Sequence, residues 1–251
     1  MVDSDARPLV TQAMGLRERL ADIARFAARP TYPAPPLGWG HAAAPGLVAA
    51  LGIVFAFDLA LGELIVMATN AWDADAGFMP APLEFEATFA EDLFDFLILA
   101  PLLEELVFRG WLTGRIAALR FALYGFAAMA LFSAALYLPV EYVAAVSLTG
   151  VAVAFAGLLH WGVTRDTGTE VPAWFTHHFH WFVWGSSLAF GLIHLGNYEP
   201  LAHPLGLLVV LPQTIGGLLL AYTRTRLGLG AAIAHHAAYN AVFLASDYGL
   251  W

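Results

Sequence analysis

The segment from Pro101 to Gly110 places two adjacent carboxylates in a strongly apolar stretch. An ionisable side chain inside a membrane helix costs about 2.5–3.5 kcal/mol on insertion scales, so such residues often mark function. Glu105 and Arg109 are four residues apart, which predicts that they share a helix face and form an ion pair. Glu104 then points about 100° away and is a candidate general base facing a polar cavity. The alternative is a purely architectural ion pair.

Histidine and asparagine form two further clusters in apolar segments. His194 follows Phe190 by four residues near the end of one segment, where it is either a catalyst or a satisfied interfacial residue. His236 and Asn240 are also four residues apart, so they share a helix face and can converge on one oxygen atom. The alternative for this pair is an interhelical hydrogen-bond patch, a common use of polar residues in membrane bundles.

These residue types can hydrolyse an amide bond without a serine or cysteine nucleophile. The reaction needs a base that activates water and donors aimed at the developing oxyanion, and a carboxylate, two histidines and an asparagine supply both. The chain has no cysteine, which excludes a thiolate nucleophile and cysteine-ligated zinc. All eleven basic residues are arginine, which excludes a Schiff-base lysine. A bilayer cannot deliver water, so the site must lie in a cavity open to one face.

The elements that position these clusters are membrane helices. The 251 residues are 60% hydrophobic and 12% charged, whereas a soluble domain is about 45–50% apolar and about 25% charged. In lipid the backbone must satisfy its own hydrogen bonds, so apolar runs of about 18 or more residues predict helices and not strands. We predict an all-α, polytopic membrane bundle of about seven transmembrane helices. They are expected near residues 44–68, 93–113, 121–138, 142–163, 174–195, 205–223 and 229–246.

Two parts of different composition follow from this division. Residues 1–41 form a polar, proline-containing preamble with an amphipathic helix, which lies either on a membrane surface or in solvent. Residues 42–251 form the membrane-embedded domain. With seven crossings, the preamble and the arginine-bearing loops fall on one side, and the opposite loops carry acids and no arginine. The positive-inside rule then predicts a cytoplasmic N-terminus. The net charge of −9 argues against a nucleic-acid partner.

The three clusters occur in the order Glu-Glu-x-x-x-Arg, Phe-x-x-x-His and His-x-x-x-Asn. This ordered set resembles the CAAX-protease and bacteriocin-processing family of membrane proteins, also called the CPBP or Abi family, which includes the type II CAAX prenyl endopeptidases. The context Pro-Leu-Leu-Glu-Glu-Leu-Val-Phe-Arg-Gly around the first cluster adds to the resemblance. The resemblance covers about residues 90–248, so the first apolar segment and the preamble lie outside it.

The resemblance implies a glutamic-type intramembrane protease. By that analogy Glu104 would activate the water with help from His194, and His236 and Asn240 would stabilise the oxyanion. Three residues would support the site: Glu105, Arg109 and Phe190. Family members generally work without a required metal, so no cofactor is expected. The implied partner is a membrane-bound peptide or protein, such as a prenylated CAAX tail, a bacteriocin leader or a C-terminal sorting anchor.

Other interpretations of the same residues stay open. One is a non-catalytic membrane scaffold or immunity protein of the same fold. Another is a transporter that uses the acids and histidines as a relay. A third is a metal-dependent hydrolase built on His194, His235 and His236. The separate histidine cluster within His177–His180 is either a metal site or an interfacial belt. The arginine-rich, lysine-free composition favours a bacterial inner (plasma) membrane.

These assignments leave the spacing of the clusters and three acidic residues unexplained. About ninety residues separate the first and second clusters, more than the resemblance predicts, and the helices between residues 120 and 173 could alter the substrate entry. Asp58, Glu63 and Asp95 are acids in or beside apolar segments without an assigned partner. The substrate and the oligomeric state are also left open.

Overall fold

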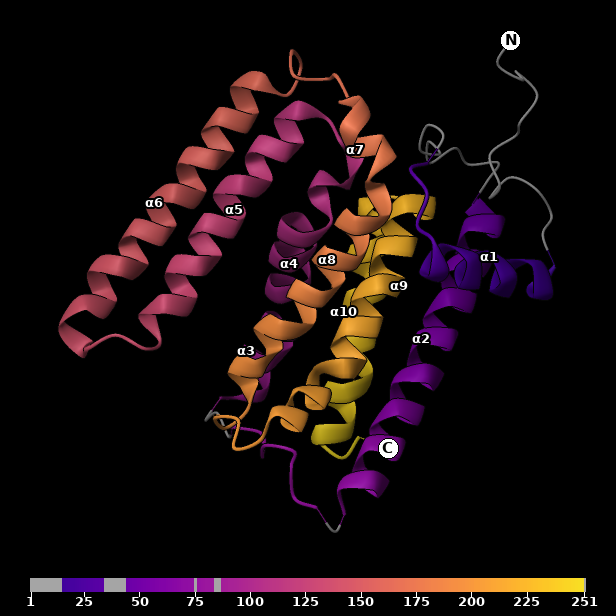
Figure 1. Ribbon diagram of the computed structural model, residues 1–251, viewed down its shortest axis with the longest axis vertical. Coiled ribbons are helices and arrows are strands. Elements are labelled where there is room, and N and C mark those ends of the chain that lie inside the picture. The colour runs from indigo at the N-terminus through magenta and orange to yellow at the C-terminus, as the bar shows by residue number, and fades with distance from the viewer. Residues whose placement is uncertain (1–14, 34–43, 75, 84–86, 251) are drawn as a thin grey trace. The chain divides into compact units, whose positions relative to one another are not determined.

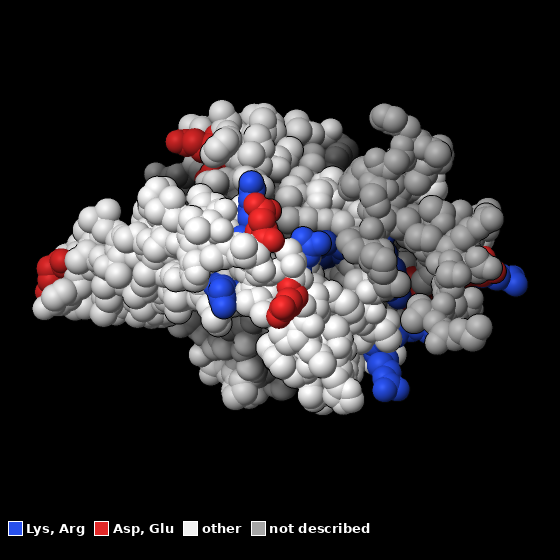
Figure 2. Space-filling view, turned by 90° about the horizontal axis from the view of Figure 1, so that it is seen from above, with Lys and Arg blue, Asp and Glu red and all other residues white. Residues whose placement is uncertain are grey.

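The computed structural model describes residues 15–33, 44–74, 76–83 and 87–250, so most of the predicted preamble lies outside the described residues. The predicted all-α class is confirmed, because these residues form helices and no strands. The chain divides into two compact units, residues 1–102 with 179–251 and residues 103–178. Figure 2 shows isolated charged side chains on an otherwise uncharged face, as the composition predicts.

Four of the described helical stretches are long and apolar enough to cross a membrane. They cover Val48–Asp73, Ile116–Ala135, Val140–Thr164 and Pro204–Leu227. The predicted span at 229–246 is helix α10 (Leu229–Asp247), and the one at 174–195 is divided into α7 (Ala173–His177) and α8 (Phe179–Ile193). The count of seven therefore stays a prediction, whereas an integral membrane protein is supported.

The predicted helix at 93–113 is divided by a change of helix type. It consists of α3 (Phe89–Phe94), the π-helical turn η2 (Asp95–Leu99), α4 (Ala100–Phe108) and the short 3-10 helix η3 (Gly110–Thr113). Pro101 lies at the junction of η2 and α4, and proline has no N–H with which to continue the backbone pattern. Widened turns of this kind are frequent at functional sites.

In the first unit, helix α9 (Leu211–Leu227) is the central element. It packs against α8, α10, α1 (Leu16–Ala28) and α2 (Ala44–Asp73), as Figure 1 shows. Small residues allow these close approaches, because a side chain at Gly191 of α8 would overlap Thr214 of α9. The 3-10 helices η4 (His194–Asn197) and η5 (Pro204–Val210) connect α8 to α9.

Helix α1 is bound to α9 by a buried polar cluster. The Arg226 guanidinium donates from Nε and Nη2 to the Asp22 carboxylate at 3.0 and 3.2 Å, and the Tyr222 hydroxyl donates to the same group at 3.0 Å. Ile23 and Phe26 of α1 are buried beside it. A bidentate arginine–carboxylate pair fixes orientation as well as contact, so the amphipathic helix of the preamble is held against the helical bundle.

The second unit is dominated by the hairpin of α5 (Ile116–Ala135) and α6 (Val140–Thr164). Gly157 of α6 lies against Tyr124 of α5, and the Tyr124 hydroxyl is 3.1 Å from Nδ1 of His160. Few residues of the hairpin are buried, since only 17% and 11% of its two apolar windows lie inside the protein. Apolar helices of membrane-spanning length with outward apolar faces fit a lipid environment.

Candidate active site

The first cluster lies on α4 and its C-terminal end, in the second unit. Nη1 of Arg109 donates to Oε1 of Glu105 at 2.8 Å, and both side chains have no exposed surface. The ion pair predicted from the spacing is therefore present. The Arg109 guanidinium also lies 5.6 Å from the centre of the Phe108 ring. Glu104 is half-buried on the same helix, whereas Glu105 is fully buried.

The position of His194 defines which of its ring nitrogens is basic. His194 begins η4 directly after α8, and its Nδ1 lies 2.7 Å from the carbonyl oxygen of Phe190. A carbonyl oxygen can only accept a hydrogen bond, so Nδ1 carries a proton. In the neutral imidazole the lone pair is then on Nε2, the nitrogen that can accept a proton from water.

His236 and His194 meet the same aromatic ring. The Phe190 ring centre is 4.8 Å from that of His194 and 5.7 Å from that of His236. Phe190 and His236 are both buried, whereas His194 is half-buried. Helices α8 and α10 therefore bring the second and third clusters together inside the first unit. The predicted supporting residue Phe190 contacts both histidines.

Asn240 binds the backbone of the π-helical turn. Its Nδ2 donates to the carbonyl oxygen of Phe96 at 2.8 Å. The Ala100 N–H donates to the carbonyl of Asp95, five residues earlier, and the same pattern would pair Phe96 with the N–H of residue 101. Residue 101 is proline and has none, so the asparagine amide replaces the missing donor. An amide nitrogen has two hydrogens, and this bond uses one of them.

The structure thus brings together Phe190, His194 and His236, and Asn240 belongs to the same unit. The other three, Glu104, Glu105 and Arg109, belong to the second unit. That Glu104 meets the histidines is a prediction from the sequence and the resemblance.

A buried polar network beside His236 was missed by the sequence analysis. Oδ2 of Asp58 on α2 lies 3.1 Å from Nε2 of His235 on α10, and Oγ1 of Thr223 on α9 lies 3.0 Å from Nδ1 of the same ring. All three side chains are buried. The signal for Asp58 was an acid in an apolar helix, but nothing in the sequence paired it with His235. Thr223 gave no signal, because threonine is common in membrane helices. Asp95 and Glu63 are exposed.

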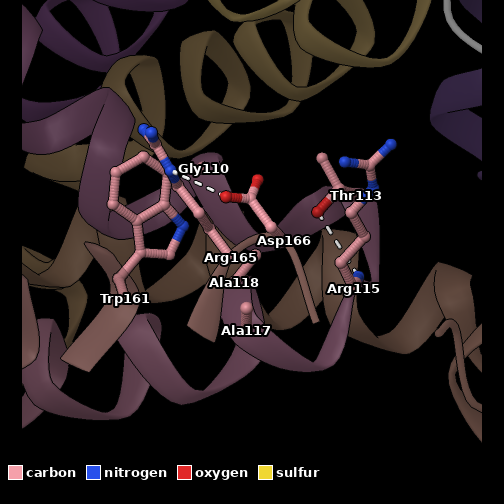
Figure 3. A pocket seen from close by; sticks show the side chains of 8 residues that line it. All are labelled: Gly110, Thr113, Arg115, Ala117, Ala118, Trp161, Arg165 and Asp166. Carbon is pink, nitrogen blue, oxygen red and sulfur yellow. Dashed lines mark hydrogen bonds and ion pairs between the residues drawn. The ribbon is translucent and has the colours of Figure 1, made fainter. Parts of the chain in front are cut away.

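Among the residues that the structure describes, no group of three histidine, aspartate or glutamate side chains is placed to hold a metal ion. An open cavity of about 310 Å³ lies in the second unit, where the start of α5 meets the end of α6 (Figure 3). Its polar wall includes Thr113, Arg115 and Arg165, and it contains none of the seven predicted site residues.

The fold defines an all-α membrane protein in which two histidines, from η4 and α10, contact one phenylalanine ring. Residues 169–242 match the family model described as Type II CAAX prenyl endopeptidase Rce1-like. The resemblance to CAAX proteases is confirmed for this segment, which contains His194, His236 and Asn240, whereas Glu104 precedes it. The match supports a membrane endopeptidase of the CAAX-protease type. No curated protein and no solved structure matches the chain.

Proposed function

We propose that the protein is an intramembrane endopeptidase that cleaves a membrane-associated or lipid-anchored peptide with a water activated by Glu104. The observation that carries the proposal is the arrangement of His194 and His236 on one Phe190 ring, within the segment that matches the endopeptidase family. Further support comes from Asn240, which is bound to the carbonyl of Phe96 by one of its two amide hydrogens and keeps the other for the oxyanion.

The reaction follows from the chemistry of these groups. The Glu104 carboxylate takes a proton from water as the water oxygen attacks the scissile carbonyl carbon. His194 accepts from the same water through Nε2, because its Nδ1 proton is bound to the Phe190 carbonyl. His236 and the second N–H of Asn240 donate to the oxyanion. When the C–N bond breaks, Glu104 returns the proton to the leaving amine, which balances the reaction without a covalent intermediate.

The buried Glu105–Arg109 pair has a supporting role in this proposal. The two charges neutralise each other inside the helix that carries Glu104, so the pair orients that helix without competing for the water. In this proposal the protein lies in a bacterial inner membrane. The positive-inside rule predicts that its N-terminus is cytoplasmic. A prenylated CAAX tail is the first substrate to examine, because the matched family is named for it.

The test uses the purified full-length protein in detergent with a farnesylated CAAX peptide, a bacteriocin leader and a C-terminal sorting anchor as separate probes. Glu104→Ala is expected to abolish cleavage while its thermal unfolding matches wild type. Glu141→Gln, which removes an exposed acid at the start of α6, is the matched control and keeps full activity. Wild-type turnover in Glu104→Ala would remove the mechanism. Absence of cleavage of all three probes by the wild type would favour the scaffold alternative.

A further inference from the structure

Asp58, His235 and Thr223 form a deeply buried polar network that the proposed reaction does not use. His235 is 1% exposed, Asp58 3% and Thr223 0%. The three residues come from α10, α2 and α9, so one imidazole ring joins three helices. The Phe55 ring meets the His235 ring edge to face at 5.8 Å and closes another side of it. Gly216 on α9 lies beside the Asp58 carboxylate, at a distance that a Cβ would fill with ordinary van der Waals contact.

The His235 ring has a polar neighbour at each of its nitrogens. The Thr223 hydroxyl donates to the carbonyl of Leu219 at 3.0 Å, so its oxygen accepts from Nδ1 of His235. Nε2 of His235 lies 3.1 Å from Oδ2 of Asp58, which is an ion-pair contact without the geometry of a hydrogen bond.

The network resembles an acid–histidine–hydroxyl triad, but its burial excludes nucleophilic catalysis. Thr223 has no exposed surface and its hydroxyl is committed to Leu219, so no substrate carbonyl can approach its oxygen. Any effect of the network on the proposed reaction therefore passes through a neighbouring residue. His236 is the adjacent residue on α10, about 100° around the helix from His235.

We propose that Asp58 is a positioning residue that fixes the rotation of α10 through His235 and so directs His236 toward the substrate site. The proposal rests on the proposed function, in which His236 stabilises the oxyanion. Helix α10 is held at two points along its length, by His235 to α2 and α9 and by Asn240 to the Phe96 carbonyl. A helix held at both points cannot turn about its axis, and His236 lies between them on the sequence. Helix α2 precedes the matched segment 169–242, so a working site needs residues from outside that segment.

The test compares Asp58→Asn with Glu63→Gln, which makes the same chemical change to an exposed acid of the same helix. The first readout is the ring nitrogen resonance of His236 in detergent-solubilised, ¹⁵N-histidine-labelled protein, assigned with His236→Gln. The second is cleavage of the farnesylated CAAX peptide. Asp58→Asn is expected to move the His236 resonance and lower kcat by about 10–100-fold with KM nearly unchanged, because small displacements of a reacting group have effects of this size. Glu63→Gln is expected to change neither.

A second pair of variants keeps the proposal testable if Asp58→Asn does not fold. Thr223→Val removes the hydroxyl that receives the Nδ1 proton, and Thr223→Ser keeps it. The valine variant is expected to reproduce the changes at His236, and the serine variant to behave as wild type. A His236 resonance and a kcat equal to wild type in Asp58→Asn, or in Thr223→Val if the first variant does not fold, overturn the proposal. If the wild type cleaves no probe, the proposed function fails, and the resonance comparison still decides whether Asp58 positions His236.

Discussion

Breaking the buried Glu105–Arg109 pair is expected to lower the stability of the protein strongly. The two charged groups lie 2.8 Å apart at their nearest atoms and have no exposed surface. Two unit charges about 4 Å apart attract by about 4 kcal/mol at an effective dielectric constant of about 20. Removing one partner also leaves the other charge buried, and the combined loss is typically about 3–5 kcal/mol. Glu105→Ala and Arg109→Ala should each lose an amount in this range.

The loss converts to a measurable shift in thermal unfolding. A chain of this size loses about 2–4 °C in Tm for each kcal/mol, so each single variant should unfold about 6–20 °C below wild type. The eight tryptophans provide the fluorescence signal in detergent. The double variant Glu105→Leu/Arg109→Leu should recover most of the loss, because an apolar pair of similar volume removes both desolvated charges.

An exposed ion pair provides the control. Nε of Arg165 is 3.8 Å from Oδ2 of Asp166, and the two side chains are 55% and 87% exposed. Such pairs contribute about 0–1 kcal/mol, so Arg165→Ala should shift the Tm by at most about 4 °C. If both Glu105→Ala and Arg109→Ala unfold within the range of this control, the pair does not stabilise the fold and the reasoning is wrong.

Three further predictions concern the Asn240–Phe96 hydrogen bond, the Thr88–Glu91 helix cap and the effect of a chelator. Asn240→Ala should lower the free energy of unfolding by about 1–3 kcal/mol when residue 101 is proline, because the Phe96 carbonyl loses its donor. The loss should be smaller in the Pro101→Ala variant, in which residue 101 has a backbone N–H. Equal losses in the two backgrounds would refute this account. The Thr88 backbone N–H and then its hydroxyl lower the pKa of the Glu91 carboxyl below its ordinary 4.5, so this stabilisation is present above pH 4.5 and is lost as the pH falls through the lowered value. Glu91→Gln should therefore flatten the fall of Tm in acid, and an unchanged pH profile would contradict it. Treatment with EDTA should leave peptide cleavage unchanged, whereas loss of activity that zinc restores would support the metal-dependent alternative.

Short-range spacing accounts for much of what could be predicted. Glu105 and Arg109 at four residues apart form the expected ion pair, and the long apolar runs form helices. These features depend on the 3.6-residue period and on the need of a backbone in lipid to satisfy itself, both of which are local properties. The division of the predicted helix at 93–113 was not foreseen in detail, although Pro101 marked the place.

The sequence alone determined the all-α membrane class, the local pairing on α4 and the residue types of the candidate site. Only the tertiary structure decided that Asp58 and Thr223 contact His235, that Phe190 contacts two histidines, and that Asn240 replaces the donor absent at Pro101. The reason is physical. The spanning helices are apolar on nearly every side, so periodicity does not indicate which face meets which neighbour, and the polar partners become defined only when the helices pack.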